Sequence, residues 1–236
     1  MLILGIETAT VKAGCAIGGH EGVLASAHSG KAKRHAENLT PAIEFICGQA
    51  GIELGEIGLV AVDVGPGLFT GLRVGVATAK AIAFGLRVPM IGVSSLDLLA
   101  FPVRFSNRLI VTAIDARRGE LYYAFYRQVP GGVQRLGEHQ IGSPDDLASQ
   151  LLASPDEILL VGDGANRYAE AFEGLAKVEL VTHDHCHPSA ESLVQLAHAR
   201  ALREDWVNPW EIQPLYLRKP DAQINWATRN TGGSAS

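Results

Sequence analysis

The chain has 236 residues, 47% of them hydrophobic and 19% charged, which is typical of a globular protein with a sizeable core. Its formal net charge of -5 disfavours a protein that binds nucleic acid by itself, because such proteins carry a basic surface. Three widely spaced cysteines predict a reducing cytoplasm, and we expect neither a secretion signal in MLILGIETAT nor an apolar stretch long enough to span a membrane.

The first half of the chain alternates short apolar runs with helical patterns. An apolar run at the N-terminus and two runs with brief glycine-bearing breaks predict a three-stranded meander. The later alternation of strands and helices predicts a mostly parallel sheet that is covered by helices. We expect strands at 1–8, 13–19, 22–30, 58–65 and 88–95, and helices at 35–51, 69–86 and 95–103.

The pattern restarts after Arg104. Here Ser143 and Pro144 have the spacing of an N-cap and a first helical residue. Because a meander followed by strand–helix alternation occurs twice, we expect two similar lobes around a cleft, 1–106 and 107–222, with a flexible tail at 223–236. The last helix either stays in the second lobe or packs back on the first. The second set of strands is expected at 108–116, 120–127, 133–141 and 157–165, and its helices at 143–153 and 188–205.

A glycine loop joins the strand at 58–65 to the following helix. Backbone N–H groups at a helix N-terminus attract anions, so Gly65, Gly67 and Thr70 are candidate contacts for a nucleotide or another anion. No lysine follows the glycines as in a Walker loop, and as a phosphate motif the loop is weak.

Two polar turns are further candidates for nucleotide or anion contacts. Glu7, Thr8 and Thr10 end the first strand, where they either hold a metal–nucleotide complex or satisfy their own turn. Arg117 and Arg118 lie in a tight turn, where they are either solvated or, if the turn faces the cleft, pair with phosphate or carboxylate. The run His183–His187 predicts a solvated loop rather than a catalytic metal site.

Small residues recur every four positions along the helix at 69–86. They are Gly71, Gly75, Ala79 and Ala83. Glycine inside a helix costs about 1 kcal/mol relative to alanine, so this stripe indicates close approach by another element. Spacing alone leaves two readings: the protein's own sheet, which it modestly favours, or a helix of another chain.

Several of these segments together resemble the TsaB family, also called YeaZ. The resemblance covers residues 2 to about 222, with Leu68 standing where the family usually has serine. It implies the actin-like, sugar kinase and Hsp70 ATPase fold, with two similar lobes around a cleft. The segments are ILGIETAT, RHAENLTPAI, VDVGPGLFTGLRVGVATAKAIA, GVSSLDLLA, IDARRGELYYAFY and PLYLRKPDA.

The resemblance also implies a function. TsaB works with its sibling TsaD and the ATPase TsaE to form threonylcarbamoyladenosine at position 37 of tRNAs that read codons starting with A. TsaD carries two metal-binding histidines on the helix after the strand that corresponds to VPMIGV. Here that helix has no histidine and only Asp97 as a ligand, so we expect no catalytic residue, no metal and no tightly bound cofactor, with weak ATP or ADP at a joint surface left open.

The family's docking helices correspond to residues of about 36–51 and 69–86. They imply binding to TsaD, a homodimer when the chain is alone, and tRNA contact only through the complex. The implied docking residues are His35, Glu37, Leu39, Ile43, Gly71, Arg73, Gly75, Ala79 and Ala83.

Two other functions stay open. The first is an ATP-binding or ATP-hydrolysing enzyme of the same fold, which Glu7 disfavours because it replaces the usual phosphate-loop aspartate. The second is a glycoprotease-like metallopeptidase, which the missing histidine pair disfavours.

Overall fold

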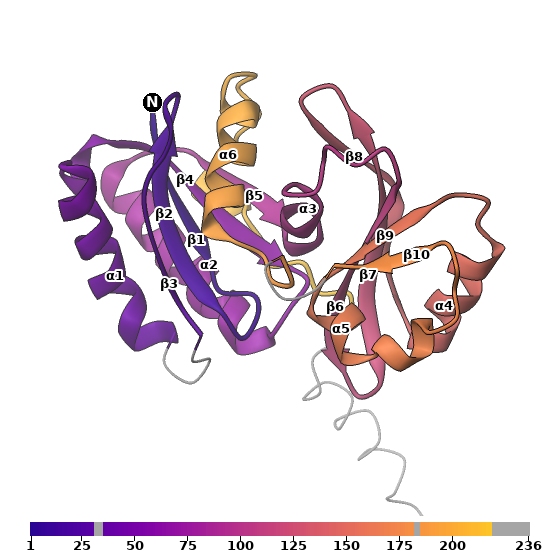
Figure 1. Ribbon diagram of the computed structural model, residues 1–236. Helices are drawn as coiled ribbons and strands as arrows, with labels where there is room; N and C mark the ends of the chain where they lie inside the picture. The colour runs from indigo at the N-terminus through magenta and orange to yellow at the C-terminus, as the bar shows by residue number, and fades with distance from the viewer. Residues whose placement is uncertain (31–34, 182–184, 219–236) are drawn as a thin grey trace, which may run out of the picture.

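The computed structural model describes residues 1–30, 35–181 and 185–218, except for the side chains of residues 35–37. It contains two five-stranded sheets, each with helices on both faces (Figure 1). The first sheet has the order β3-β2-β1-β4-β5 and the second the order β8-β7-β6-β9-β10. The strands are β1 (Leu2–Glu7), β2 (Ala13–Gly19), β3 (Gly22–Ser29), β4 (Ile57–Gly65), β5 (Met90–Ser94), β6 (Leu109–Arg117), β7 (Glu120–Val129), β8 (Gly132–Gly142), β9 (Ile158–Val161) and β10 (Val178–Leu180).

The two sheets share one topology. In each, the first three strands form an antiparallel meander, and the remaining two continue the sheet in parallel on the other side of the first strand. This duplicated arrangement is that of the actin-like, sugar kinase and Hsp70 ATPase fold, and it confirms the predicted fold class.

Helices cover the outer face of each sheet. In the first lobe α1 packs on β2 and β3 while α2 packs on β4 and β1. In the second lobe α4 and α5 share a hydrophobic cluster with β6, β7 and β9. The α-helices are α1 (His35–Ala50), α2 (Phe69–Leu86), α3 (Ser95–Ala100), α4 (Pro144–Ala153), α5 (Asp163–Arg167) and α6 (Ala190–Ala201), and short 3-10 turns are η2 (Leu54–Glu56), η3 (Ala169–Phe172) and η4 (Pro209–Glu211).

The inner faces are covered by an exchange of helices between the two halves of the chain. α6 follows the second sheet but packs on β1 and β2 of the first, where Leu193 and Val194 contact the first sheet's core. α3 follows the first sheet but packs its Leu96 and Leu99 on β6 and β7 of the second. Figure 1 shows both helices between the two sheets, in contact with each other.

Local signals explain the helix ends. The Ser143 hydroxyl accepts the Asp146 N–H at 3.1 Å, which confirms the predicted cap of α4. Ser189 caps α6 in the same way through Ser192 N–H. Pro41 lies inside α1.

α2 corrects one expectation about apolar stretches. It has 18 residues with a mean hydropathy of 1.2, and by length and composition alone it would be able to cross a membrane. Its buried residues instead pack on β4 and β1 of the first sheet, as a core helix does. The helix is apolar because one of its faces belongs to the core.

We predict that replacing Leu193 by alanine destabilises the whole molecule. This side chain is fully buried between α6 and the first sheet, so its truncation should lower the free energy of unfolding by about 2–5 kcal/mol. Leu202→Ala, just after α6, is the matched control because that side chain is 73% exposed. Urea unfolding monitored by circular dichroism measures both, and equal stability of the two variants would contradict the exchange of helices.

Candidate functional site

Two buried carboxyl groups lie at the carboxyl edge of the first sheet. β1 and β4 are parallel neighbours with Ile6 opposite Val62, so the next residues lie side by side, with Glu7 at the end of β1 and Asp63 near the end of β4. Each side chain is 1% exposed. Glu7 accepts the Ala9 N–H at 2.7 Å, while one oxygen of Asp63 accepts the Gly65 N–H at 2.8 Å and the Ser95 hydroxyl at 2.6 Å.

The pair favours protonated carboxyl groups. Burial is the largest cause that raises the pKa of Asp63, to about 7, against the hydrogen bonds from Ser95 and Gly65. Burial and the neighbouring Asp63 raise the pKa of Glu7 well above its ordinary value. The second oxygen of Asp63 is buried without a hydrogen-bond partner among the described residues. A site of this kind holds a proton at neutral pH.

The entrance to α2 is closed by the turn after β1. The Leu68 N–H donates to the carbonyl oxygen of Ala9 at 2.7 Å. A Cβ atom at Gly67 would overlap that same oxygen, so the glycine makes room for the turn. A carbonyl of the chain itself thus occupies the approach to the N-terminus of α2 in this structure, and the anion contacts of Gly65 and Gly67 stay a prediction. Thr70 is exposed on the first turn of α2.

The two threonines near Glu7 serve the local backbone. The Thr8 hydroxyl donates to the carbonyl oxygen of Gly71 at 2.8 Å, and Thr10 bonds within its own turn to Lys12. Both side chains are buried. These contacts agree with the other interpretation of the sequence, in which the threonines satisfy the turn backbone, and the nucleotide contacts of Thr8 and Thr10 stay a prediction.

The small-residue stripe of α2 faces the protein's own core. A Cβ atom at Gly71 would overlap the Thr8 carbonyl oxygen, and one at Gly75 would overlap the Thr8 hydroxyl. Ala79 and Ala83 are fully buried in the cluster between α1, α2 and the first sheet. The predicted docking role of these four residues is therefore wrong, because none of them is accessible to a partner.

The predicted docking residues of α1 are corrected in part. Leu39 and Ile43 are 4% exposed and belong to the same core cluster, so they do not form a docking surface. The side chains of His35 and Glu37 lie outside the described residues. Arg73 on α2 is exposed, with its guanidinium 3.9 Å from the centre of the Phe69 ring, and its Nε donates to the Tyr216 hydroxyl.

The second lobe has its own polar hairpin. Arg118 and Gly119 form its two-residue tip with positive φ angles of 59° and 77°, as in a type I′ turn. Arg117 pairs with Asp115 at 3.2 Å, and Arg167 approaches the same carboxylate at 3.4 Å. These contacts give Arg117 a structural partner in its own hairpin; Arg118 is exposed at the tip.

Asp97 on α3 is held by the second lobe. The Tyr126 hydroxyl donates to it at 2.8 Å, and Arg135 lies 3.4 Å from the same oxygen. The sequence analysis missed Tyr126 and Arg135, because neither belongs to a local motif. It also left Asp63 out, although a single aspartate in the apolar run GLVAVDVG was a signal for a buried functional or structural carboxyl group.

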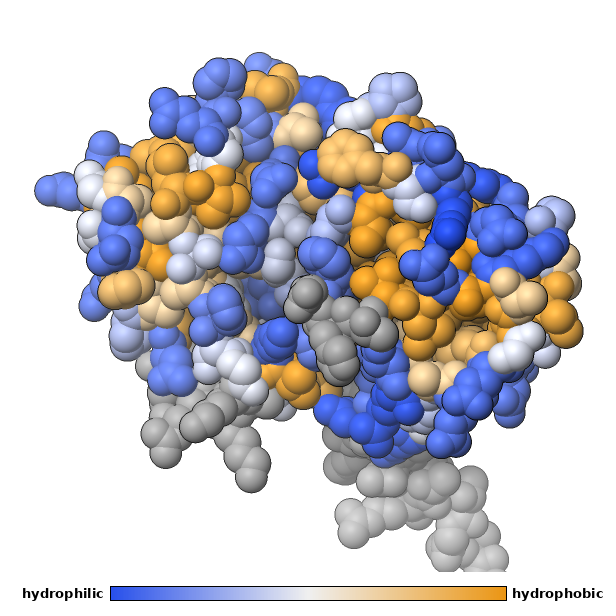
Figure 2. Space-filling view, in the orientation of Figure 1, coloured by the Kyte–Doolittle hydropathy of each residue, from blue (hydrophilic) through white to orange (hydrophobic). Residues whose placement is uncertain are grey.

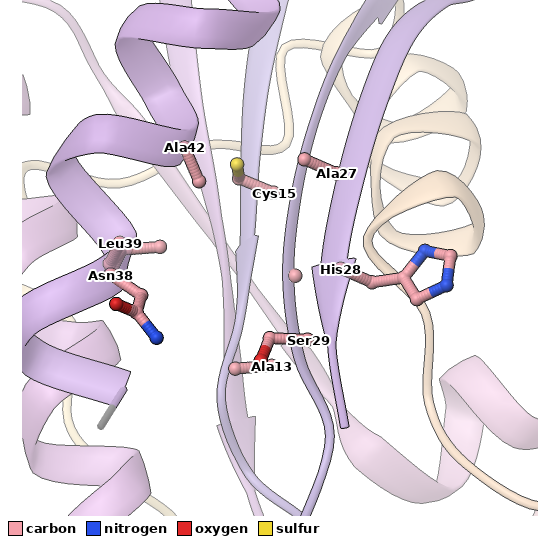
Figure 3. A pocket seen from close by; sticks show the side chains of 9 residues that line it. Ala13, Cys15, Ala27, His28, Ser29, Asn38, Leu39 and Ala42 are labelled. Carbon is pink, nitrogen blue, oxygen red and sulfur yellow. The ribbon is translucent and has the colours of Figure 1, made fainter. Parts of the chain in front are cut away.

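Two small cavities flank the meander of the first lobe. One of about 210 Å³ contains polar groups from Glu7, Lys12, His28, His187 and Glu191. Burial and Lys12 lower the pKa of His187, a described member of the predicted His183–His187 loop that lines this cavity. The other cavity, of about 80 Å³, lies between α1 and β2 (Figure 3). Cys15, Leu39 and Ala42 face it, while the ring of His28 points to the opposite side of the sheet.

No described group of three or more His, Cys, Asp or Glu side chains has the placement of a metal site. The described part of the chain thus contains a buried pair of carboxyl groups with raised pKa values, and turns whose polar groups hydrogen-bond to the chain itself.

We predict that Gly75→Ala destabilises the isolated chain although alanine is the better helix former. Its methyl group would meet the Thr8 hydroxyl, and overpacking of this kind costs about 1–3 kcal/mol. Gly85→Ala, on the same helix with open space around the added atom, should be neutral or stabilise by about 0.5–1 kcal/mol. Melting curves of the two variants decide, and a stabilised Gly75→Ala protein would contradict the contact.

We also predict an unusual pH dependence. Because Asp63 keeps its proton up to about pH 7 when folded but loses it near pH 4 when unfolded, folded stability should fall between these values as the pH rises. The slope contributed by one such proton is at most about 1.4 kcal/mol per pH unit. Asp63→Asn should flatten it, whereas Glu173→Gln, on an exposed side chain, should not. Urea unfolding at pH 5, 6 and 7 measures the slopes; a slope unchanged in Asp63→Asn would refute the buried proton.

The chain is similar in sequence to known proteins. A family model described as TsaD, tRNA N6-adenosine threonylcarbamoyltransferase, matches residues 28–226. The tRNA threonylcarbamoyladenosine biosynthesis protein TsaB of Escherichia coli is 30% identical over 224 residues, which are 92% of this chain and 95% of that protein. An uncharacterized protein of Mycobacterium leprae is 39% identical over 94% of this chain, and the chain spans 56% of its length.

A solved structure of YeaZ from Pseudomonas aeruginosa has the same fold. It superposes with a TM-score of 0.80 at 26% identity and covers 92% of this chain and 99% of its own. Sequence and structure agree with the motifs read from the chain, and the predicted resemblance is confirmed. The chain belongs to the TsaB/YeaZ family.

Proposed function

We propose that the chain is a non-catalytic partner of TsaD that acts with TsaE in forming threonylcarbamoyladenosine at position 37 of tRNAs that read codons starting with A. The observation that carries the proposal is the closed entrance of α2. The Ala9 carbonyl accepts the Leu68 N–H at the N-terminus of α2, where an anion would need the free backbone N–H groups. Family membership supplies the process.

The two enzyme alternatives find less support. For an ATPase, the turn after β1 would need to leave α2, because Thr8 and Ala9 fill the space beside Gly67 and Gly71. For a metallopeptidase, residues 88–104 hold no histidine, and Asp97 is engaged by Tyr126 and Arg135. Among the described residues, the buried carboxyl pair has no third ligand, and it lacks the openness of a catalytic metal centre.

The outward faces of α1 and α2 are the surface we propose for docking. Phe45 on α1 is 58% exposed, and hydrophobic residues gather on the α1 side of the first lobe (Figure 2). On α2 the exposed positions include Ala77, Ala81 and Gly85, which again recur every four residues. Small side chains of this kind let a facing helix approach closely, so the docking stripe lies opposite to the one expected from sequence.

The same surface would join two copies of the chain when TsaD is absent. TsaD would then compete with the second copy. With a net charge of -5, the chain would meet tRNA through the complex in the cytoplasm. Any ATP or ADP would bind weakly at the joint surface.

Reconstitution tests the function directly. TsaD, TsaE, tRNA and a source of threonylcarbamoyl adenylate should form the modified nucleoside when this chain is added and fail to do so without it. The isolated chain should neither hydrolyse ATP nor transfer the group. Full modification without the chain, or turnover by the chain alone, would refute the proposal.

Ala81→Arg should separate docking from folding. The side chain is exposed, so the melting temperature should stay unchanged, whereas a bulky charge in a helix contact costs about 1–3 kcal/mol, roughly 5- to 150-fold in affinity. Ala153→Arg places the same change on an exposed alanine of the second lobe and should bind normally. Sedimentation and TsaD titration measure both, and normal TsaD binding by Ala81→Arg would reject this surface.

A further inference from the structure

The chain crosses between its two lobes at Ser94. This residue ends β5, and α3 begins at the next one. β8 of the second lobe reaches the same point, where Nε2 of His139 lies 3.0 Å from the Ser94 hydroxyl and 2.8 Å from Nη1 of Arg135. Arg135 also reaches Asp97. We call Ser94, Asp97, Arg135 and His139 the junction cluster.

A bulge in β8 creates this contact. Leu136 pairs with Phe125 and Gln140 with Tyr123, so residues 137–139 stand opposite the single residue Ala124. Gly137 takes a φ of 81°, which favours glycine. The additional residues bend the strand, as bulges do, and bring His139 and Arg135 to the start of α3.

The hydrogen bonds fix where the proton of His139 resides. A guanidinium can only donate, so the Nε2 that faces Arg135 must accept and the ring proton must be on Nδ1. The Ser94 hydroxyl already accepts the Leu96 N–H at 3.2 Å, and its own hydrogen is free to donate to Nε2. The cluster is therefore complete only with a neutral imidazole.

We propose that the junction cluster is a pH-sensitive clamp on the crossing between the lobes, closed while His139 is neutral and released when Nε2 takes up a proton. A protonated Nε2 would direct its N–H at the N–H of Arg135 and place two cations in contact. The Ser94 hydroxyl would no longer have Nε2 as an acceptor, and the repulsion between Arg135 and His139 would push β8 away from the crossing between β5 and α3.

The charges around His139 give the direction of the effect. Burial is the largest cause that lowers the pKa of His139, and Arg135 lowers it further, against Asp97 and Glu138, which raise it. The Tyr126 hydroxyl faces Asp97 from β7 and holds that carboxylate on α3. Because the pKa is lowered in the closed state, the clamp is complete above about pH 6.5, the usual histidine value, and weakens as the pH falls below it.

Hydrogen exchange of the intact chain tests the clamp. Backbone protection of residues 94–101 and 134–142, corrected for intrinsic exchange, should fall between pH 7.5 and pH 5 by up to about tenfold per pH unit. In His139→Gln, whose amide oxygen accepts from Arg135 without titrating, this fall should be absent. His198→Gln, on α6, is the matched control and should behave like the unaltered chain.

Two results would overturn the proposal. One is the same fall in protection in His139→Gln as in the unaltered chain. The other comes from NMR titration of the His139 ring, a measurement that needs no variant: a pKa at or above 6.5 would mean that the closed cluster does not favour the neutral ring. A lower pKa together with the loss of pH dependence in His139→Gln is the expected outcome.

Discussion

The exchange of α3 and α6 is the contact on which the rest of the structure depends. Each sheet has an apolar inner face, which must be buried against another element because its exposure to water is unfavourable. The first sheet buries it under α6, which the second half of the chain supplies, and the second sheet buries it under α3, which the first half supplies. The two lobes look like separate units in sequence, but neither can complete its core alone.

The position of α3 between the lobes also determines the contacts at the carboxyl edge of the first sheet. α3 begins at Ser95, whose hydroxyl bonds Asp63, and its Asp97 is held by Tyr126 and Arg135 of the second lobe. The turn after β1 is bonded to the start of α2 in two places. The Leu68 N–H donates to the Ala9 carbonyl, and the Thr8 hydroxyl donates to the Gly71 carbonyl. Groups that would serve a ligand in an open cleft here bind one another, which favours a fixed scaffold over a clamp that closes on substrate.

Sequence reasoning found the repeated fold because its signals are local. Apolar runs bounded by glycines mark strands, and Ser143 with Pro144 marks a helix start. It did not predict β10, whose three residues are too few for a pattern, and it left the final packing of α6 open. His139 and Ser94 are 45 residues apart, and only a bulge in β8 brings them together. The spacing of residues in the sequence does not predict a contact of this kind.

The glycine stripe shows why a correct pattern led to a wrong site. Its period of four identified a face of α2 that another element approaches closely, and this is what Thr8 does. Period alone does not say which element approaches. α2 has two faces of small residues. The inner one, at Gly71 and Gly75, lies against Thr8 in the turn after β1, and the outer one, at Ala77 and Ala81, is exposed.

This double character explains the high hydropathy of α2. A helix that is apolar around most of its circumference is stable in water only when both sides are covered. The first sheet covers the inner side. Within the described chain, Tyr216 and Trp210 contact the outer side only near Phe69 and Phe84, while Ala77 and Ala81 between them stay exposed. Apolar surface on the outer side of α2 is unfavourable in water, and this cost is removed when a second chain packs against it. The composition of α2 is thus itself an argument that the protein works as part of an assembly.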